Sequence, residues 1–186
     1  MVKKILFKTF SFVNKLYLLL SLRKQCFHGG LVFRVAATCP DSSSIDLRDS
    51  DTFKTTINIE GDKNTVSGEN AYIADTLITI SGNHNRLLLG NGVKLRRANV
   101  IIRGNGCTVQ IGERTTFGGV RIVNVGSGNI VDIGKDSLFA DQIEIWASDT
   151  HSIYDEHGKW INPEKPVKVG NRVWVGSKVT ILKGVT

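Results

Sequence analysis

The stretch from residue 104 to residue 134, GNGCTVQIGERTTFGGVRIVNVGSGNIVDIG, decides the fold, because each of two glycines in it recurs after 22 residues. Gly104 is followed by Gly126, and Gly112 is followed by Gly134. Both series extend outward in step through the chain. The first comprises Gly61, Gly82, Gly104 and Gly126, with Asn64, Asn85, Cys107 and Asn129 three residues further on, and the second comprises Gly68, Gly90, Gly112 and Gly134. Such a repeat is typical of a solenoid and not of a helix bundle.

Apolar residues, most of them aliphatic, recur every six positions within each repeat. The runs are Leu89, Leu95, Ile101; Ile111, Phe117, Val123; Ile133, Phe139, Ile145; and Val169, Val175, Ile181. Three hexads form one turn of a triangular coil, and the extra residues of each unit, such as GNGC and GSGN, form a bulged corner. Stacked coils bury the aliphatic side chains, and Gly and Asn suit corners that require a positive φ. The sequence therefore predicts an all-β solenoid, and the sixfold spacing favours a left-handed parallel β-helix over a right-handed one.

The hexad rhythm breaks after Thr150, and the next aliphatic residue in phase is Val169. Residues 151–168, HSIYDEHGKWINPEKPVK, are therefore predicted to leave the solenoid as a loop. A loop of this length in a compact fold is typically functional or disordered. We expect the chemistry of the protein to lie at its base.

Asp149 and His151 stand two residues apart where the loop begins, so an extended chain places both side chains on one face. An imidazole oriented by a carboxylate is a common general base near neutral pH. We therefore predict catalytic roles for His151 and Asp149. The alternatives are that His151 makes only a surface hydrogen bond and that Asp149 pairs with a cation.

The remaining histidines and the cysteines give no sign of a metal site. His157 is expected to be a solvated loop residue, and His84 a corner residue. Zinc enzymes need clustered ligands, whereas His28, His84 and His151 lie in unrelated phases of the repeat. The cysteines are Cys26, Cys39 and Cys107, an odd number at irregular spacing that predicts neither a disulfide framework nor structural zinc and fits a reducing cytoplasm.

The first 40 residues differ from the rest in charge. They contain seven basic residues and no acidic one, namely Lys3, Lys4, Lys8, Lys15, Arg23, Lys24 and Arg34, which leaves 17 basic and 17 acidic residues in 41–186. The net charge of +7 is therefore confined to this segment and does not indicate nucleic-acid binding by the body. We predict a basic N-terminal helix and linker over 1–40 and a β-helix domain over 41–186.

Residues 3–26 fit one amphipathic helix whose polar stripe contains Lys4, Lys8, Ser11 and Lys15. The longest uncharged run is seven residues, whereas a membrane-spanning helix needs about 20 apolar residues, and no signal-peptide cleavage site follows closely. The helix suits either anionic lipid headgroups or a partner subunit. The expected location is the cytoplasm, with peripheral contact to the inner face of the cytoplasmic membrane through residues 3–26.

The segments SDTHSI (148–153) and VWVG (173–176), together with the hexads VGNRVW, VGSKVT and ILKGVT, resemble the hexapeptide-repeat acyltransferases, and within them the bacterial O-acetyltransferases of capsule and lipopolysaccharide sugars. The resemblance covers about residues 105–186. It implies a homotrimer of left-handed β-helices that binds acetyl-CoA between adjacent subunits, without a metal. An acetyl group would pass from acetyl-CoA to a sugar hydroxyl of a surface polysaccharide or its precursor.

The same resemblance implies roles for individual residues. His151 would be the general base, Trp174 would line the acetyl-CoA channel beside Gly176, and the backbone N–H of Ser177 would stabilise the oxyanion. Tyr154 and Trp160 are candidates for stacking on the acceptor sugar, or for fixing their own loop to the solenoid. Four cations could meet CoA phosphates or simply be solvated: Arg96, Arg97, Lys165 and Lys168.

The sequence stops at Thr186, the last residue of a hexad, whereas members of the resembled family continue with further coils. We therefore expect it to bind acetyl-CoA more weakly than a chain with a full set of coils. Two function classes remain open at this point. One is an acetyl-CoA-dependent O-acetyltransferase, and the other is a truncated, non-catalytic solenoid that acts as a scaffold or glycan-binding protein.

Overall fold

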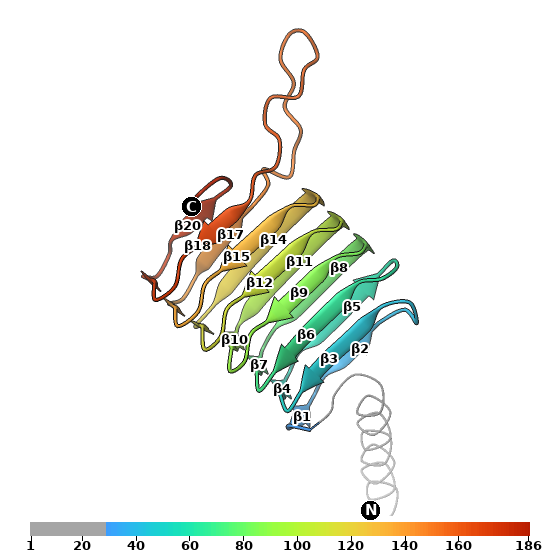
Figure 1. Cartoon of the computed structure of the whole chain (residues 1–186), viewed down its shortest axis with the longest axis vertical. Helices are drawn as coiled ribbons and strands as arrows, with labels where there is room; N and C mark the ends of the chain where they lie inside the picture. Colours follow the sequence, from blue (N-terminus) through green and yellow to red (C-terminus); the bar gives the residue numbers. More distant parts are fainter. Residues whose placement is uncertain (1–28) are drawn as a thin grey trace, which may run out of the picture.

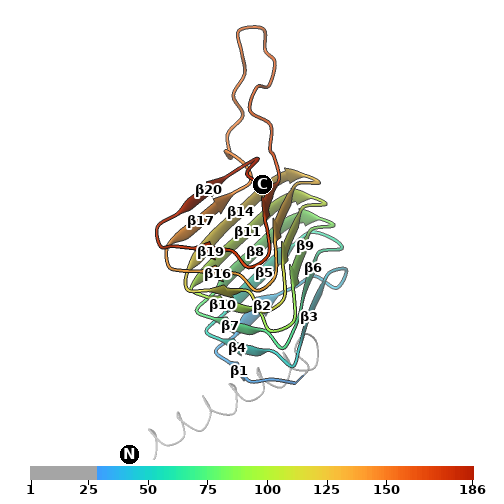
Figure 2. The same cartoon turned by 60° about the vertical axis from the view of Figure 1, so that its left-hand side comes forward.

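A computed structural model describes residues 29–186, which form a parallel β-helix with three sheets (Figures 1 and 2). The first sheet contains β1 (Val32–Phe33), β4 (Asp51–Phe53), β7 (Tyr72–Ala74), β10 (Lys94–Arg96), β13 (Thr116–Phe117), β16 (Leu138–Phe139) and β19 (Trp174–Val175). The second contains β2 (Ala36–Thr38), β5 (Thr56–Glu60), β8 (Leu77–Asn83), β11 (Ala98–Asn105), β14 (Val120–Ser127), β17 (Ile143–Trp146) and β20 (Thr180–Leu182). The third contains β3 (Ser44–Arg48), β6 (Thr65–Glu69), β9 (Arg86–Leu89), β12 (Thr108–Ile111), β15 (Ile130–Ile133) and β18 (Val167–Val169).

Each sheet forms one face of a three-sided coil, and successive coils pair strand on strand. Inward side chains therefore stack in ladders, because equivalent positions of neighbouring coils are in register. Phe117 and Phe139 are fully buried, and their rings stack with centroids 4.6 Å apart. Leu89, Ile111 and Ile133 form a second ladder. The predicted solenoid is thus confirmed.

Buried asparagines bridge the coils at one corner. The side-chain amide of Asn85 donates to the carbonyl of Gly104 at 2.8 Å, and that of Asn129 donates to the carbonyl of Ala147 at 2.9 Å. Cys107 occupies the equivalent place in the coil between them, and its thiol donates to the carbonyl of Gly126 at 3.2 Å. Burial raises the pKa of this thiol. The Asn/Cys series in the sequence therefore marks a polar ladder that satisfies corner carbonyls.

The glycines three residues before this ladder allow the coils to approach closely. Gly82, Gly104 and Gly126 have φ values between 104° and 131°. A Cβ atom on Gly104 would lie 1.8 Å from the carbonyl oxygen of Gly126. Glycine is therefore required here both by its backbone conformation and by the neighbouring coil.

The sixfold spacing predicts the wrong inward residues for part of the second sheet. Ile101 and Val123 pair with Trp146 and not with Ile145, whose register partner is Ile122. The inward ladder therefore comprises Val100, Ile122 and Ile145. The reason is a corner that is one residue longer before β17 than before β14, so a strict count of six slips by one position.

The start of the solenoid and the end of the loop also differ from the positions predicted from the sequence. β1 and β2 already pair with β4 and β5, so the solenoid begins at Val32, inside the segment assigned to the N-terminal linker. The loop ends at Pro166, because Val167 pairs with Val131. The helix expected over residues 3–26 lies outside the described residues. Within residues 29–186, no helix is long and apolar enough to cross a membrane.

Candidate active site at the base of the extruded loop

The loop leaves the solenoid at the corner between the second and third sheets, after β17, and projects far from the coils before returning to β18 (Figure 1). Its two arms are joined at the neck by a hydrogen bond from the Lys165 amide to the Ala147 carbonyl, 3.3 Å long. Further out, Tyr154 and Trp160 form an antiparallel bridge. The returning arm packs over Gly126, where a Cβ atom would lie 2.9 Å from Glu164 Cγ. The predicted extruded loop is thus a narrow hairpin.

The backbone turns sharply just before His151. Thr150 has a φ of 62°, in the left-handed region that a β-branched residue rarely adopts. Its amide donates to Ser148 Oγ at 3.0 Å, which holds this turn in place. Uncommon backbone conformations of this kind persist where the surrounding structure enforces them, and they cluster at functional sites.

Asp149 binds a lysine from the last described coil. Lys183 Nζ donates to Asp149 Oδ2 at 2.5 Å, and the side-chain amide of Asn162 donates to the same oxygen at 2.9 Å. The hydrogen bond from Lys183, followed by that from Asn162, lowers the pKa of the Asp149 carboxyl below its ordinary value. Of the two partners considered for Asp149, the cation is the one it contacts.

Asn162 connects the two arms of the loop. Besides Asp149, its Nδ2 donates to the backbone carbonyl of His151 at 2.8 Å. Its Oδ1 accepts from the amide of Ile153 at 2.6 Å and from Trp160 Nε1 at 2.9 Å. All the polar capacity of this one side chain is therefore used, and two of its four hydrogen bonds fix the backbone of His151 and Ile153. Neither Asn162 nor Lys183 was identified from the sequence, because an amide in a loop and a lysine 34 residues away from Asp149 show no local pattern.

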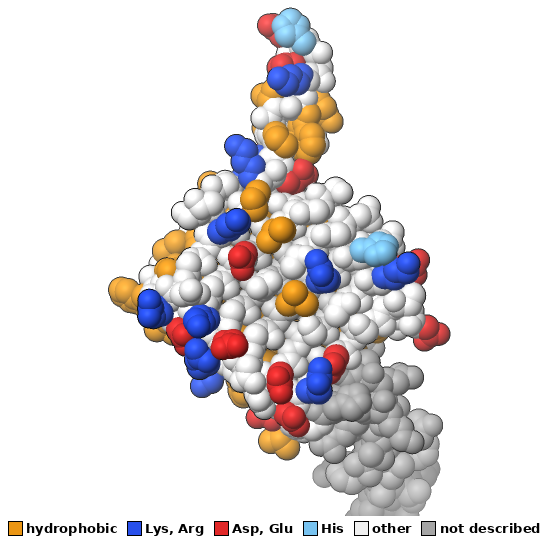
Figure 3. Space-filling model, in the orientation of Figure 1, with side chains coloured by type: hydrophobic (Ala, Val, Ile, Leu, Met, Phe, Trp, Pro, Cys, Tyr) orange, Lys and Arg blue, Asp and Glu red, His pale blue; other side chains and the backbone are white. Residues whose placement is uncertain are grey.

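The two aromatic candidates lie on the same hairpin. Tyr154 and Trp160 are both exposed, and Ile153 and Ile161 beside them are exposed as well. In Figure 3 hydrophobic side chains cover the middle of the loop, and charged side chains occupy both its tip and its neck. Trp160 Nε1 donates to Asn162 Oδ1 at 2.9 Å, a bond within the loop and not to the solenoid.

Trp174, Gly176 and Ser177 lie elsewhere on the chain. Trp174 points outward from β19 on the first sheet, where it is 74% exposed and in register with the exposed Leu138. The loop leaves from the corner between the other two sheets, and in a three-sided coil that corner is opposite the first sheet (Figure 2). A single chain therefore does not bring His151 and Trp174 together.

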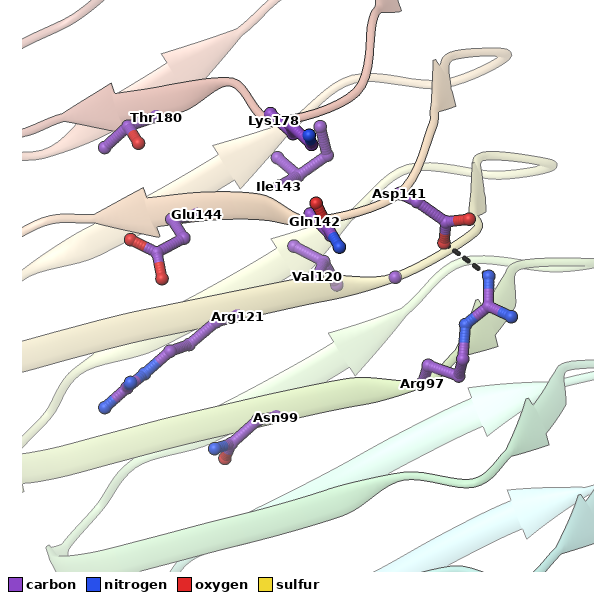
Figure 4. A pocket seen from close by; sticks show the side chains of 11 residues that line it. Arg97, Asn99, Val120, Arg121, Asp141, Gln142, Ile143, Glu144, Lys178 and Thr180 are labelled. Carbon is purple, nitrogen blue, oxygen red and sulfur yellow. Dashed lines mark hydrogen bonds and ion pairs between the residues drawn. The ribbon is translucent and has the colours of Figure 1, made fainter.

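Two clefts on the solenoid surface contain neither His151 nor Trp174, but Arg97 lines one and Lys168 lines the other, and both were candidates for contact with CoA phosphates. One of about 720 Å³ lies over the second sheet, and Figure 4 shows that Arg97 and Asp141 form an ion pair at its edge. Gly119, in the coil between them, leaves room for this pair. On the coils facing the viewer in Figure 3, basic and acidic side chains are interspersed.

Within the described residues, no group of three or more His, Cys, Asp and Glu residues could hold a metal ion.

A parallel β-helix that extrudes a histidine-bearing loop has the architecture of a hexapeptide-repeat acyltransferase. Comparison with known proteins identifies the family. The polysialic acid O-acetyltransferase of Neisseria meningitidis is 35% identical over 148 residues, which cover 67% of this chain and 68% of that protein. The chain therefore belongs to the family of polysialic acid O-acetyltransferases, which are left-handed β-helix sugar O-acetyltransferases of the hexapeptide-repeat type.

Further similarities agree with this assignment. A polysialic acid O-acetyltransferase of Escherichia coli O1:K1 / APEC is 40% identical over 85 residues, which cover 45% of this chain and 27% of that protein. The crystal structure of the polysialic acid O-acetyltransferase OatWY superposes with a TM-score of 0.67 at 30% identity, over 85% of this chain and 71% of that one. The polysialic-acid-specific acetyltransferase NeuO gives a TM-score of 0.66 at 26% identity, over 86% and 68%. No family model matches the chain.

Proposed function

We propose that this protein transfers an acetyl group from acetyl-CoA to a sugar hydroxyl of a capsular polysaccharide, with polysialic acid as the acceptor class. The similarity to polysialic acid O-acetyltransferases supports the reaction and the acceptor. The observation that carries the proposal to particular residues is the placement of His151. It stands at the neck of the loop, directly after the left-handed turn at Thr150 and beside a hydrogen-bonded cluster.

The chemistry assigned to this chain needs a base and an oxyanion donor. A sugar hydroxyl is a poor nucleophile at neutral pH, so His151 would take its proton as the oxygen attacks the thioester carbonyl. The backbone N–H of Ser177 would donate to the oxygen on which negative charge develops. The exposed indole of Trp174, together with Leu138, offers an apolar surface for the pantetheine arm near Gly176. Tyr154 and Trp160 would contact the acceptor sugar.

A homotrimer would complete the site. His151 and Trp174 lie on opposite sides of one solenoid, so the donor side of one subunit and the loop of its neighbour would form each active site together. This arrangement also gives a partner to the exposed apolar side chains of the hairpin, since an isolated hairpin is only marginally stable in water.

The test of the function is release of free CoA thiol when the protein is mixed with acetyl-CoA and polysialic acid. We expect thiol release that depends on the polymer, together with O-acetyl groups on the sugar detected by NMR. A neutral capsular polysaccharide serves as the matched acceptor control. Absence of release with every glycan tested, by a folded protein, would favour a scaffold or glycan-binding role.

The shared site has its own test. Coexpression of differently tagged His151→Ala and Trp174→Ala chains, followed by purification of the mixed oligomer, should restore part of the activity, because one interface would then contain both intact residues. Each variant alone should be nearly inactive. Mixed oligomers that stay as inactive as the single variants would exclude a site shared between subunits.

We further propose peripheral attachment to the inner face of the cytoplasmic membrane through residues 3–26. The concentration of positive charge in the first 40 residues supports this. Each basic residue near an anionic surface contributes about 1 kcal/mol, so binding should weaken as salt is added. Flotation with anionic and with neutral liposomes measures it, and equal flotation with both would contradict an electrostatic attachment.

A further inference from the structure

Lys183 is the most fully engaged cation at the base of the loop. It follows β20, and its Nζ donates to three oxygens: Asp149 Oδ2 at 2.5 Å, the Asn162 carbonyl at 3.0 Å and the Pro163 carbonyl at 3.2 Å. An ammonium has three donors, so all of them are used. The Lys183 side chain is only 16% exposed, which is unusual for a lysine. Little water therefore competes with the three oxygens for these charge-assisted hydrogen bonds.

The three acceptors lie on both arms of the loop. Asp149 is on the outgoing arm, whereas Asn162 and Pro163 are on the returning one, so Lys183 holds the two arms together from the coil below. Asn162 extends this connection, because its Nδ2 donates both to Asp149 and to the carbonyl of His151. An unbroken series of hydrogen bonds therefore runs from Lys183 to the backbone of His151.

The rest of the loop gives little support to His151. The hairpin projects from the solenoid with its apolar side chains exposed, and near His151 its arms are joined by two backbone bonds, from Lys165 to the Ala147 carbonyl at 3.3 Å and from Ile161 to the Ile153 carbonyl at 2.9 Å. The left-handed Thr150 beside His151 costs about 1–2 kcal/mol and must be held in place. The Thr150 amide is held by Ser148 Oγ, and the bonds made by Lys183 and Asn162 fix the residues on either side of this turn.

We propose that Lys183 is a positioning residue for His151, and that Asn162 and Asp149 transmit its effect. This inference rests on the proposed function, in which His151 is the base. It gives Asp149 a different role from direct orientation of the imidazole, since Asp149 Oδ2 accepts from Lys183 and Asn162 and, among the described residues, no hydrogen bond joins Asp149 to the His151 side chain. The prediction is that loss of Lys183 misplaces the base without removing it.

The experiment compares Lys183→Met with Lys178→Met. Methionine keeps most of the aliphatic stem and removes the donors, and Lys178 is an exposed lysine of the same coil. We expect Lys183→Met to lower kcat about 10²-fold, the effect of a misplacement of about 1 Å, while the KM for acetyl-CoA stays within about twofold. Lys183→Arg should recover part of kcat, and Lys178→Met should match the wild type. Wild-type kcat in a folded Lys183→Met protein would overturn the proposal, as would an equal loss of acetyl-CoA affinity.

Asn162→Ala keeps the proposal testable if Lys183→Met does not fold. It should lower kcat to a similar extent, and the Lys183→Met/Asn162→Ala protein should lose little more than the worse single variant, because the two residues act through one network. If the decreases in kcat of the two single variants multiply in the double variant, Lys183 and Asn162 do not act on His151 through one hydrogen-bond network.

A readout without turnover separates this inference from the proposed function. Trypsin cleavage after Lys159, followed by mass spectrometry, reports how often the hairpin opens. We expect several-fold faster cleavage in Lys183→Met than in the wild type or Lys178→Met. If the wild type releases no CoA, the proposed function fails, while this assay still tests whether Lys183 holds the two arms of the loop together. Equal cleavage rates would show that Lys183 does not fix the loop.

Discussion

The coils and the loop of this protein are held by different interactions. In the coils, buried side chains such as Phe117 and Phe139 stack on their equivalents in neighbouring coils, and every strand that is not at the end of a sheet pairs with two neighbours. In the loop, the hairpin is exposed, and its base is fixed by polar bonds that converge on Lys183 and Asn162. Repetition stabilises the first region, whereas single side chains determine the second. Substitutions should therefore affect stability in the coils and turnover at the loop.

The largest expected effect is on turnover. His151→Ala should lower kcat by about 10²–10⁴-fold, the usual contribution of general acid–base catalysis, because the sugar hydroxyl would lose its proton acceptor. The thermal midpoint should not change, since His151 is exposed and outside the coils. Assay of CoA release alongside thermal unfolding measures both. His157→Ala, at the exposed tip of the same loop, is the control and should be fully active.

Near-normal turnover by a folded His151→Ala protein would contradict the assignment of catalysis to the loop and of stability to the solenoid. It would also remove His151 as the base.

The next effect is on the coils. Gly104→Ala places a methyl group 1.8 Å from the carbonyl oxygen of Gly126, at a φ of 131°. The neighbouring backbone must shift, so the free energy of unfolding should fall by about 3 kcal/mol, as for overpacking combined with backbone strain. Urea denaturation followed by circular dichroism measures this loss.

Gly128→Ala is the matched control for the coil substitution. Gly128 also has a positive φ, of 65°, but a Cβ atom there would meet nothing within 4 Å. Only the conformational cost of about 1 kcal/mol should remain. Equal losses in the two variants would mean that close stacking of the coils does not limit this corner.

The smallest effect concerns protonation at the loop base. Lys183 and Asn162 lower the pKa of Asp149, so the hydrogen bonds that these residues make at the base of the loop are stabilised while this carboxylate is ionised. That contribution is complete above the ordinary carboxyl pKa of about 4 and is lost as the pH falls through the lower folded value. NMR titration of the Asp149 carboxyl should give a midpoint below the ordinary value in the wild type. In Lys183→Met the midpoint should rise, and an unchanged midpoint would show that Lys183 does not stabilise the charged form.

The sequence was sufficient for the coil but not for every position within it. Glycine and asparagine spacing predicted the corners, because each coil repeats the same local geometry. The inward residues of the second sheet were misassigned, with Ile101 in place of Val100. The corners before β11 and β14 are one residue shorter than the corner before β17, and a sixfold count treats all corners as equal.

Gly68 illustrates the same difficulty. It stands 22 residues before Gly90, yet it is in register with Leu89 and borders the core, because the coil it belongs to is one residue shorter than those that follow. Equal spacing in the sequence therefore does not ensure an equal place in the stack.

The sequence by itself determined the solenoid, the extruded loop and the candidate base at its start, because ladders and breaks in a repeat are properties of neighbouring residues. Only the tertiary structure decided what Asp149 binds and what holds His151. Lys183 reaches Asp149 because the stacking of coils brings the residue after β20 next to a loop that leaves after β17, and Asn162 reaches it because the two arms of the hairpin pair. Such contacts depend on the whole register of the stack, and no local pattern encodes them.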